Sequence, residues 1–210
     1  MEMKRRKGSF KEEDDYNKPG RDIREVINNY KKYTTRTEFN LFLLIPIIVA
    51  CAIFVYFFIF EKSNKDLMNY IMDMNKDTLS VIAILAGFNT TSLSIIAASN
   101  NRVLSFLKKH TGSNENDNVL KQLISFFSFA IIIQLIVLII GIVISLVSKS
   151  LSEISMMFPF LTGFVVKIPL SIFGAVWLGA VLFTIMISIR NATLLYRYVI
   201  FIADYNDEDV

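Results

Sequence analysis

Long apolar runs separated by short polar segments dominate the pattern of this chain. Four runs, at residues 39–60, 79–98, 123–147 and 168–189, contain no Asp, Glu, Lys, Arg or His. Each has about the 20 residues needed to cross a hydrocarbon core of about 30 Å. A bilayer offers the backbone no water, so such runs must be helices, and the alternating segments of a barrel are missing from the sequence. The pattern predicts an all-α fold, a four-helix transmembrane bundle over residues 39–189.

The segments outside the bundle are predicted to hold short amphipathic helices. Residues 1–20, with a basic run, an acidic run and Pro19-Gly20, are expected to be disordered. Residues 21–38 carry apolar side chains at helical spacing, so this helix would lie on the membrane surface or pack on a neighbour. A basic amphipathic helix is expected over residues 100–110. Residues 190–210 should extend the last span before an acidic tail.

The distribution of Lys and Arg predicts the orientation. Of the 22 Lys and Arg residues, 17 precede the first span, lie between the second and third, or follow the fourth. Loops on the cytoplasmic side carry the excess of positive charge. Both termini are therefore expected in the cytoplasm, and the two other loops outside.

The second run is the least hydrophobic and has a face of small and hydroxyl residues. Small side chains let helices approach closely, and hydroxyls can bond across the contact. We interpret this face as a packing surface at the bundle centre, with the lining of a pore or substrate path as the alternative. Its members are Ser80, Ala83, Gly87, Thr90, Thr91, Ser94 and Ala98.

Asn89 lies on the opposite, apolar face of the same run. An amide in lipid is costly without a partner. Gln134 is the only amide in the third run, where Gly141, Ser145 and Ser148 share its face. We predict a hydrogen bond between Asn89 and Gln134, as an ordinary interhelical contact rather than an ion site.

Prolines and one apolar loop add local expectations. Pro46 should bend the first span, and Pro169 should fit the first turn of the fourth. Residues 151–167 are too apolar for open water, which predicts an interfacial loop, with a re-entrant segment as the alternative. A ladder of small residues in the fourth span, Ser171, Ala175 and Gly179, indicates tight helix association within or between subunits.

The sequence holds no recognisable catalytic or metal-binding chemistry. His110 has no Cys or carboxylate at metal-ligand spacing, and Cys51 cannot form an internal disulfide. We expect no cofactor, no bound metal and no enzymatic activity. Because the four runs contain no charged residue, proton-coupled transport and voltage sensing are also not expected. Arg102, Lys108 and Lys109 suit anionic lipid headgroups or a protein partner better than nucleic acid.

The stretch over residues 79–109 resembles a pattern found in small bacterial membrane proteins. Gly87-Phe88, Thr90-Thr91-Ser92 and Ser99-Asn100 carry the resemblance, because they place small hydroxyl residues in a span that is followed by a basic helix. The four-span layout is similar to the membrane subunit of the Kiwa anti-phage system. The resemblance implies a sensor or effector in the bacterial inner membrane that acts with a cytoplasmic partner.

Two functions follow as expectations. The first is a non-enzymatic, homo-oligomeric sensor or effector, in which the bilayer and a cytoplasmic protein are the partners. The second is an ion channel or small transporter lined by the second and third spans. The candidate packing or pore residues are Ser80, Gly87, Asn89, Thr90, Thr91, Ser94, Gln134 and Ser145.

Overall fold

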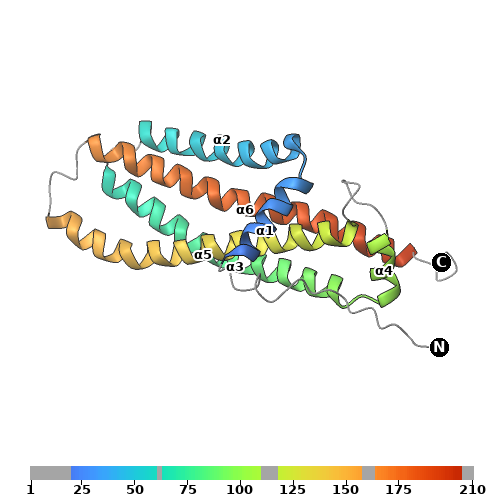
Figure 1. Ribbon diagram of the computed structural model, residues 1–210. Helices are drawn as coiled ribbons and strands as arrows, with labels where there is room; N and C mark the ends of the chain where they lie inside the picture. Colours follow the sequence, from blue (N-terminus) through green and yellow to red (C-terminus); the bar gives the residue numbers. More distant parts are fainter. Residues whose placement is uncertain (1–19, 61–62, 110–117, 158–163, 205–210) are drawn as a thin grey trace, which may run out of the picture.

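The computed structural model describes residues 20–60, 63–109, 118–157 and 164–204. The regular secondary structure of these residues is entirely α-helical (Figure 1). The disorder expected for residues 1–20 and the acidic tail lie almost wholly outside these ranges. The helices are α1 (Arg21–Tyr33), α2 (Arg36–Phe60), α3 (Asn64–Ala97), α4 (Asn101–Lys109), α5 (Val119–Met157) and α6 (Phe164–Asp204).

Four of these helices, α2, α3, α5 and α6, are long and apolar enough to cross a membrane. The predicted all-α fold is confirmed, and the chain is a multi-pass membrane protein. The four helices differ greatly in length, from 25 residues in α2 to 41 in α6. At 1.5 Å per residue these lengths are about 38 Å and about 60 Å. Therefore α6 extends well past α2 at one end of the bundle, the end that carries α4 (Figure 1).

The bundle is built from two closely packed helix pairs, α3 with α5 and α2 with α6, which are joined by contacts of α6 with α3 and α5. Aromatic and branched side chains fill the space between them. One cluster joins Phe54 of α2 to Leu67 and Ile71 of α3, and another joins Ile82, Val137, Trp177 and Val181.

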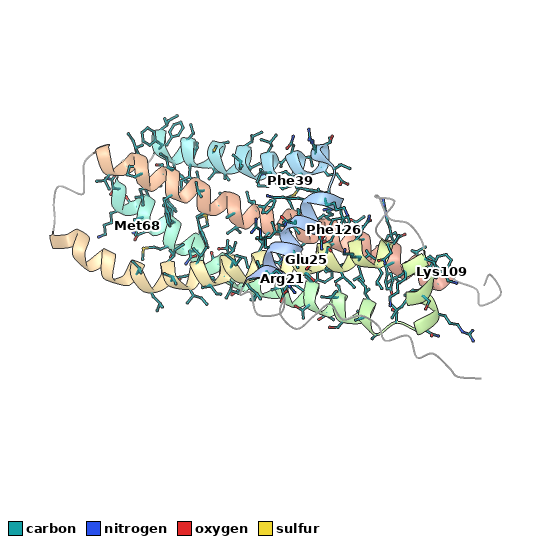
Figure 2. All side chains as sticks on the ribbon, in the orientation of Figure 1. Arg21, Glu25, Phe39, Met68, Lys109 and Phe126 are labelled. Carbon is teal, nitrogen blue, oxygen red and sulfur yellow. The ribbon has the colours of Figure 1, made fainter. Side chains whose placement is uncertain are left out.

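A small head, formed by the last turns of α3, α4, the first turns of α5 and the last turns of α6, lies beyond the start of α2. Its core consists of Ile96, Val103, Leu107, Leu120, Leu123, Phe127 and Tyr198. The Ser99 and Tyr198 hydroxyls are hydrogen-bonded across it. Figure 2 shows Lys109 in this head, far beyond Phe39 near the start of α2. The helix expected over residues 100–110 is thus confirmed, and so is the extension of the last span.

Helix α1 packs across the bundle rather than lying free (Figure 1). Its apolar face, which includes Tyr30 and Tyr33, contacts Phe126, Phe129 and Ala130 of α5 and Ile187 of α6. The Tyr30 and Phe129 rings stack with their centroids 3.7 Å apart. Of the two placements left open by the sequence, the structure has the packed one.

The loops expected outside the membrane are shorter than predicted. Ser63 caps α3 by accepting a hydrogen bond from the Lys65 backbone N–H, so residues 64–78 are helical. Residues 151–157 belong to α5 and residues 164–167 to α6, which leaves only 158–163 of the expected interfacial loop, outside the described residues. Because α6 begins at Phe164, Pro169 lies in its second turn and not in its first.

Candidate functional site

Four polar side chains meet in the interior of the bundle: Asn89 of α3, Gln134 of α5, and Ser188 and Asn191 of α6. Each is at most 3% exposed. Asn89 Nδ2 lies 3.0 Å from Gln134 Oε1, 3.1 Å from Ser188 Oγ and 3.0 Å from the Leu85 carbonyl. The predicted pairing of Asn89 with Gln134 is confirmed, although it belongs to a larger network.

The network uses the polar atoms of its amides almost completely. Gln134 Nε2 donates to Ser188 Oγ at 2.6 Å, and Asn191 Nδ2 donates to Asn89 Oδ1 at 2.9 Å. Asn191 Nδ2 also approaches the Phe126 carbonyl at 3.4 Å. Among the described residues only Asn191 Oδ1 lacks a partner in this network. Such a network locks α3, α5 and α6 together, because any displacement strands a buried polar group.

A second polar contact lies nearer the start of α3, at Asn75. Its Nδ2 donates to the Gly141 carbonyl at 3.0 Å and to Ser145 Oγ at 2.7 Å. A side chain at Gly141 would not fit, since its Cβ would lie 2.6 Å from Leu79 and 3.1 Å from the Trp177 ring. Glycine at this position therefore allows α5 to approach α3 closely.

Arg190 fastens α1 to the bundle. Its guanidinium donates to Thr34 Oγ1 at 3.2 Å and to Glu38 Oε2 at 3.3 Å, and lies 4.0 Å from the centre of the Phe126 ring. Burial raises the pKa of the neighbouring Tyr30 phenol, and the positive charge of Arg190 opposes this only in part. The phenol is thus held neutral against a face that would penalise its ionised form.

Contacts between helices show which residues of different helices lie at the same level along the bundle. The charge-free part of α2, from Phe39 to Phe60, is flanked at its first end by Glu38, which binds Arg190. At its other end Lys167 Nζ donates to the Phe58 carbonyl at 2.5 Å. The apolar band of α2 therefore coincides with residues 168–189 of α6, and together they define one hydrophobic layer.

The most apolar part of α3 does not lie level with the apolar bands of α2 and α6. The Tyr70 ring stacks on Phe57, near one edge of the layer, while Asn89 bonds Asn191, next to Arg190 at the other edge. Residues 70–89 of α3 therefore lie level with the apolar band of α2, whereas the expected span covers residues 79–98, an offset of about nine residues or about 13 Å.

This offset places charged residues level with the apolar band of α2. Asp73, Lys76 and Asp77 lie between the levels of Tyr70 and Asn89 and are exposed on the surface of the bundle. Asp73 and Lys76 form an ion pair 3.6 Å long. The expectation of no intramembrane charge assumed that residues 61–78 formed an outer loop, whereas residues 64–78 belong to α3. A single charge at the centre of a lipid-facing helix costs about 2.5–3.5 kcal/mol.

The small-residue face of α3 also points outward. Ser80, Gly87, Thr90, Thr91 and Ser94 are all exposed, whereas Asn89, Gln134 and Ser145 lie in or beside the interior contacts. The interpretation of this face as a packing surface at the bundle centre was wrong, because the buried amides occupy that position. The predicted candidates therefore divide between an interior network and an exterior stripe.

A groove at the edge of the head is lined by α1, the end of α4 and the first turns of α5. Asp22 and Glu25 line it from α1, and Lys108 and Lys121 line it from α4 and α5. Arg102, Lys108 and Lys109 are all exposed, but only Lys108 borders this groove. Within the described part of the chain no group of His, Cys, Asp and Glu could hold a metal ion, and Cys51 is exposed.

Sequence reasoning missed Asn75, Ser188, Arg190 and Asn191 as interior or anchoring residues. Asn75, Ile82 and Asn89 recur every seven residues, which is the spacing of one buried helix face. That repeat was a usable signal, but a loop was assumed at Asn75. Nothing local in the sequence marks Arg190, because its partners are about 150 residues away.

No protein-family model, curated protein or solved structure matches this chain.

Proposed function

We propose that the protein is a non-enzymatic sensor or effector of the bacterial inner membrane that works with a cytoplasmic protein partner. The excess of Lys and Arg around the head and α1 supports a cytoplasmic position for this end and for both termini. The resemblance to the Kiwa membrane subunit supports a role in anti-phage defence.

The observation that carries this proposal is the groove in the head, which combines a partner surface with a link to the membrane. Acidic side chains from α1 face basic side chains from α4 and α5, so the groove offers both signs of charge to a protein surface. Helices α3, α5 and α6 run unbroken from the hydrophobic layer into the head. A change in their packing within the bilayer therefore alters the groove.

Arg190 is placed to couple the two parts. It binds Thr34, the C-cap of α1, and Glu38 at the start of α2, and its neighbour Asn191 belongs to the interior network. Rearrangement of the network would move Arg190 and loosen α1, one wall of the groove. The transmembrane state and the partner surface are thus linked through adjacent residues of a single helix turn.

An infection assay tests the proposal with a matched pair of variants. Cells that carry the protein with its genomic neighbours are challenged with phage, and plaques are counted. We expect Lys108→Glu, which reverses a groove charge, to abolish protection, while Lys109→Glu, on the adjacent exposed position, retains it. Equal protection by both variants and the unaltered chain would exclude the groove as the partner surface. Absence of protection by all three proteins would exclude the defence role.

An ion channel is a second candidate, favoured by the polar stripe of α3 at membrane depth. Because α3 and α5 pack closely, the path would follow the exterior face of α3 rather than the space between α3 and α5. Liposome flux measurements test it. We expect ion flux that falls with Thr90→Leu but not with Ile139→Leu on the apolar exterior of α5, and no flux from the unaltered chain would exclude a channel.

A further inference from the structure

One face of α3 is exposed along the whole hydrophobic layer yet is unsuited to lipid. It carries Asn69, Asp73 and Lys76 at one end and continues through small and hydroxyl side chains, all exposed. We call this face the outer stripe, formed by Asn69, Asp73, Lys76, Ser80, Ala83, Gly87, Thr90 and Thr91. The other exposed surfaces at this depth present large apolar side chains such as Ile48, Ile139 and Val176. Lipid suits those surfaces, so the outer stripe alone requires a different neighbour.

At Gly87 the space in front of this stripe is left open by the residues that the structure describes. A Cβ atom added there would meet nothing within 4 Å, whereas one added at Gly141 or Gly174 would collide with a neighbouring helix. The interior glycines are thus used for close helix contacts. Gly87 belongs to a small-xxx-small series, Ala83, Gly87 and Thr91, which permits the same approach on the outer face.

We propose that the outer stripe is the contact between two copies of this chain, with α3 packed against α3 of the second copy. Copies inserted in the same orientation place their α3 helices parallel and at equal depth. A two-fold axis along the membrane normal then places the outer stripe of one copy against the outer stripe of the other. This inference does not depend on the sensor or effector role.

Charge complementarity favours a second copy over other occupants. The stripe and its edge offer Lys76 together with Asp73 and Asp77, so each copy carries both signs within little more than one helix turn. In the parallel arrangement Asp73 and Asp77 of the second copy lie within about one helix turn of the depth of Lys76, so that the long Lys76 side chain can reach them. The contact also removes these charges from lipid, which gives the association a driving force beyond van der Waals packing.

Cysteine cross-linking in native membranes tests the contact with the full chain. In a Cys51→Ser background, Ser80→Cys and Ala83→Cys place a thiol on the stripe, and Val176→Cys places one on the apolar exterior of α6 at similar depth. We expect mild oxidation to give a disulfide-linked dimer from both stripe positions and none from Val176→Cys. The unaltered chain, with its exposed Cys51 on α2, should also stay monomeric under these conditions.

Three outcomes would overturn the proposal. Equal cross-linking at Val176→Cys would indicate random collision. Absence of cross-linking at both stripe positions would mean that the copies do not meet there. Reaction of the Ser80→Cys thiol with a membrane-impermeant polar maleimide, without dimer formation, would instead identify a water-filled path along the stripe.

A second variant separates the contact from the fold. Gly87→Leu fills the open space and should lower the dimer fraction, measured by energy transfer between labelled copies in vesicles, at least tenfold. The thermal midpoint of the monomer in detergent should not fall, because nothing in the described part of the chain lies against Gly87. An unchanged dimer fraction in Gly87→Leu would contradict the proposed contact.

Discussion

The two faces of α3 both carry polar residues at the same levels along the bundle, but these residues are bonded on one face and exposed on the other. On the inner face, Asn75 and Asn89 are buried and bonded to α5 and α6. On the outer face, Asp73, Lys76 and the hydroxyl residues are exposed. A polar residue in a membrane helix can thus find its hydrogen-bond partner within its own chain or remain available to a second copy. The residue type alone does not show which of the two applies.

Substitutions in the interior network should have the largest effect on stability. Asn89→Leu leaves Gln134 Oε1 and Asn191 Nδ2 without their interior partner. We expect a loss of about 3 kcal/mol in the free energy of unfolding in detergent. Thr91→Leu, on the outer face of the same helix, should change it by less than about 0.5 kcal/mol. A double-mutant cycle of Asn89→Ala and Gln134→Ala that shows no coupling would contradict the assigned network.

Glycines on the two faces should respond with opposite signs. Gly174→Ala forces a Cβ into the Phe54 ring and should cost about 2 kcal/mol of stability. Gly87→Ala meets open space and should instead stabilise monomers by about 0.5–1 kcal/mol, because alanine favours the helix. Thermal unfolding in dilute detergent measures both, and destabilisation by Gly87→Ala would place that face inside the fold.

Loss of the Arg190 anchor should loosen α1 and leave the four long helices folded. Arg190→Ala removes two hydrogen bonds and the contact with the Phe126 ring. Glu38 is half-exposed, so we expect a modest cost of about 1 kcal/mol. Hydrogen exchange of residues 21–33 should accelerate several-fold, with no change in α5. Unchanged exchange would show that the apolar face holds α1 alone.

The smallest effect concerns pH. Burial raises the pKa of Tyr30 above its ordinary value of 10.0, so docking of α1 favours the protonated phenol. This contribution is present in full below pH 10 and is lost as the pH rises through the higher pKa of the folded state. Limited proteolysis of α1 should therefore increase above pH 10. In Tyr30→Phe it should not respond to this titration, and an identical pH response in both proteins would exclude Tyr30 as its cause.

The sequence predicted the helices well and their mutual register poorly. Hydropathy identified the four spans because hydrocarbon demands long apolar runs. It did not show which part of α3 lies level with α2, because the most apolar window of a helix need not be the part that packs against its neighbours. Interior contacts, such as those of Asn75 and Asn89, set this register.

The candidate site was partly predictable for a related reason. Asn89 and Gln134 could be paired because each was the only amide in its apolar run. Their partners Ser188 and Asn191, by contrast, are common residue types at the polar end of a long helix. Helical periodicity correctly grouped the outer stripe, but it cannot tell a face that meets another helix from one that faces outward.

Trp177 gives the protein a built-in optical reporter. It is the only tryptophan of the chain, 5% exposed, and its indole lies beside Gly141 in the cluster that joins α3, α5 and α6. Among the described residues its indole N–H has no hydrogen-bond partner. Its fluorescence should therefore be blue-shifted when the helices are packed and shift to the red when they separate. Rearrangements of the bundle can thus be followed in unlabelled protein, in vesicles and in real time.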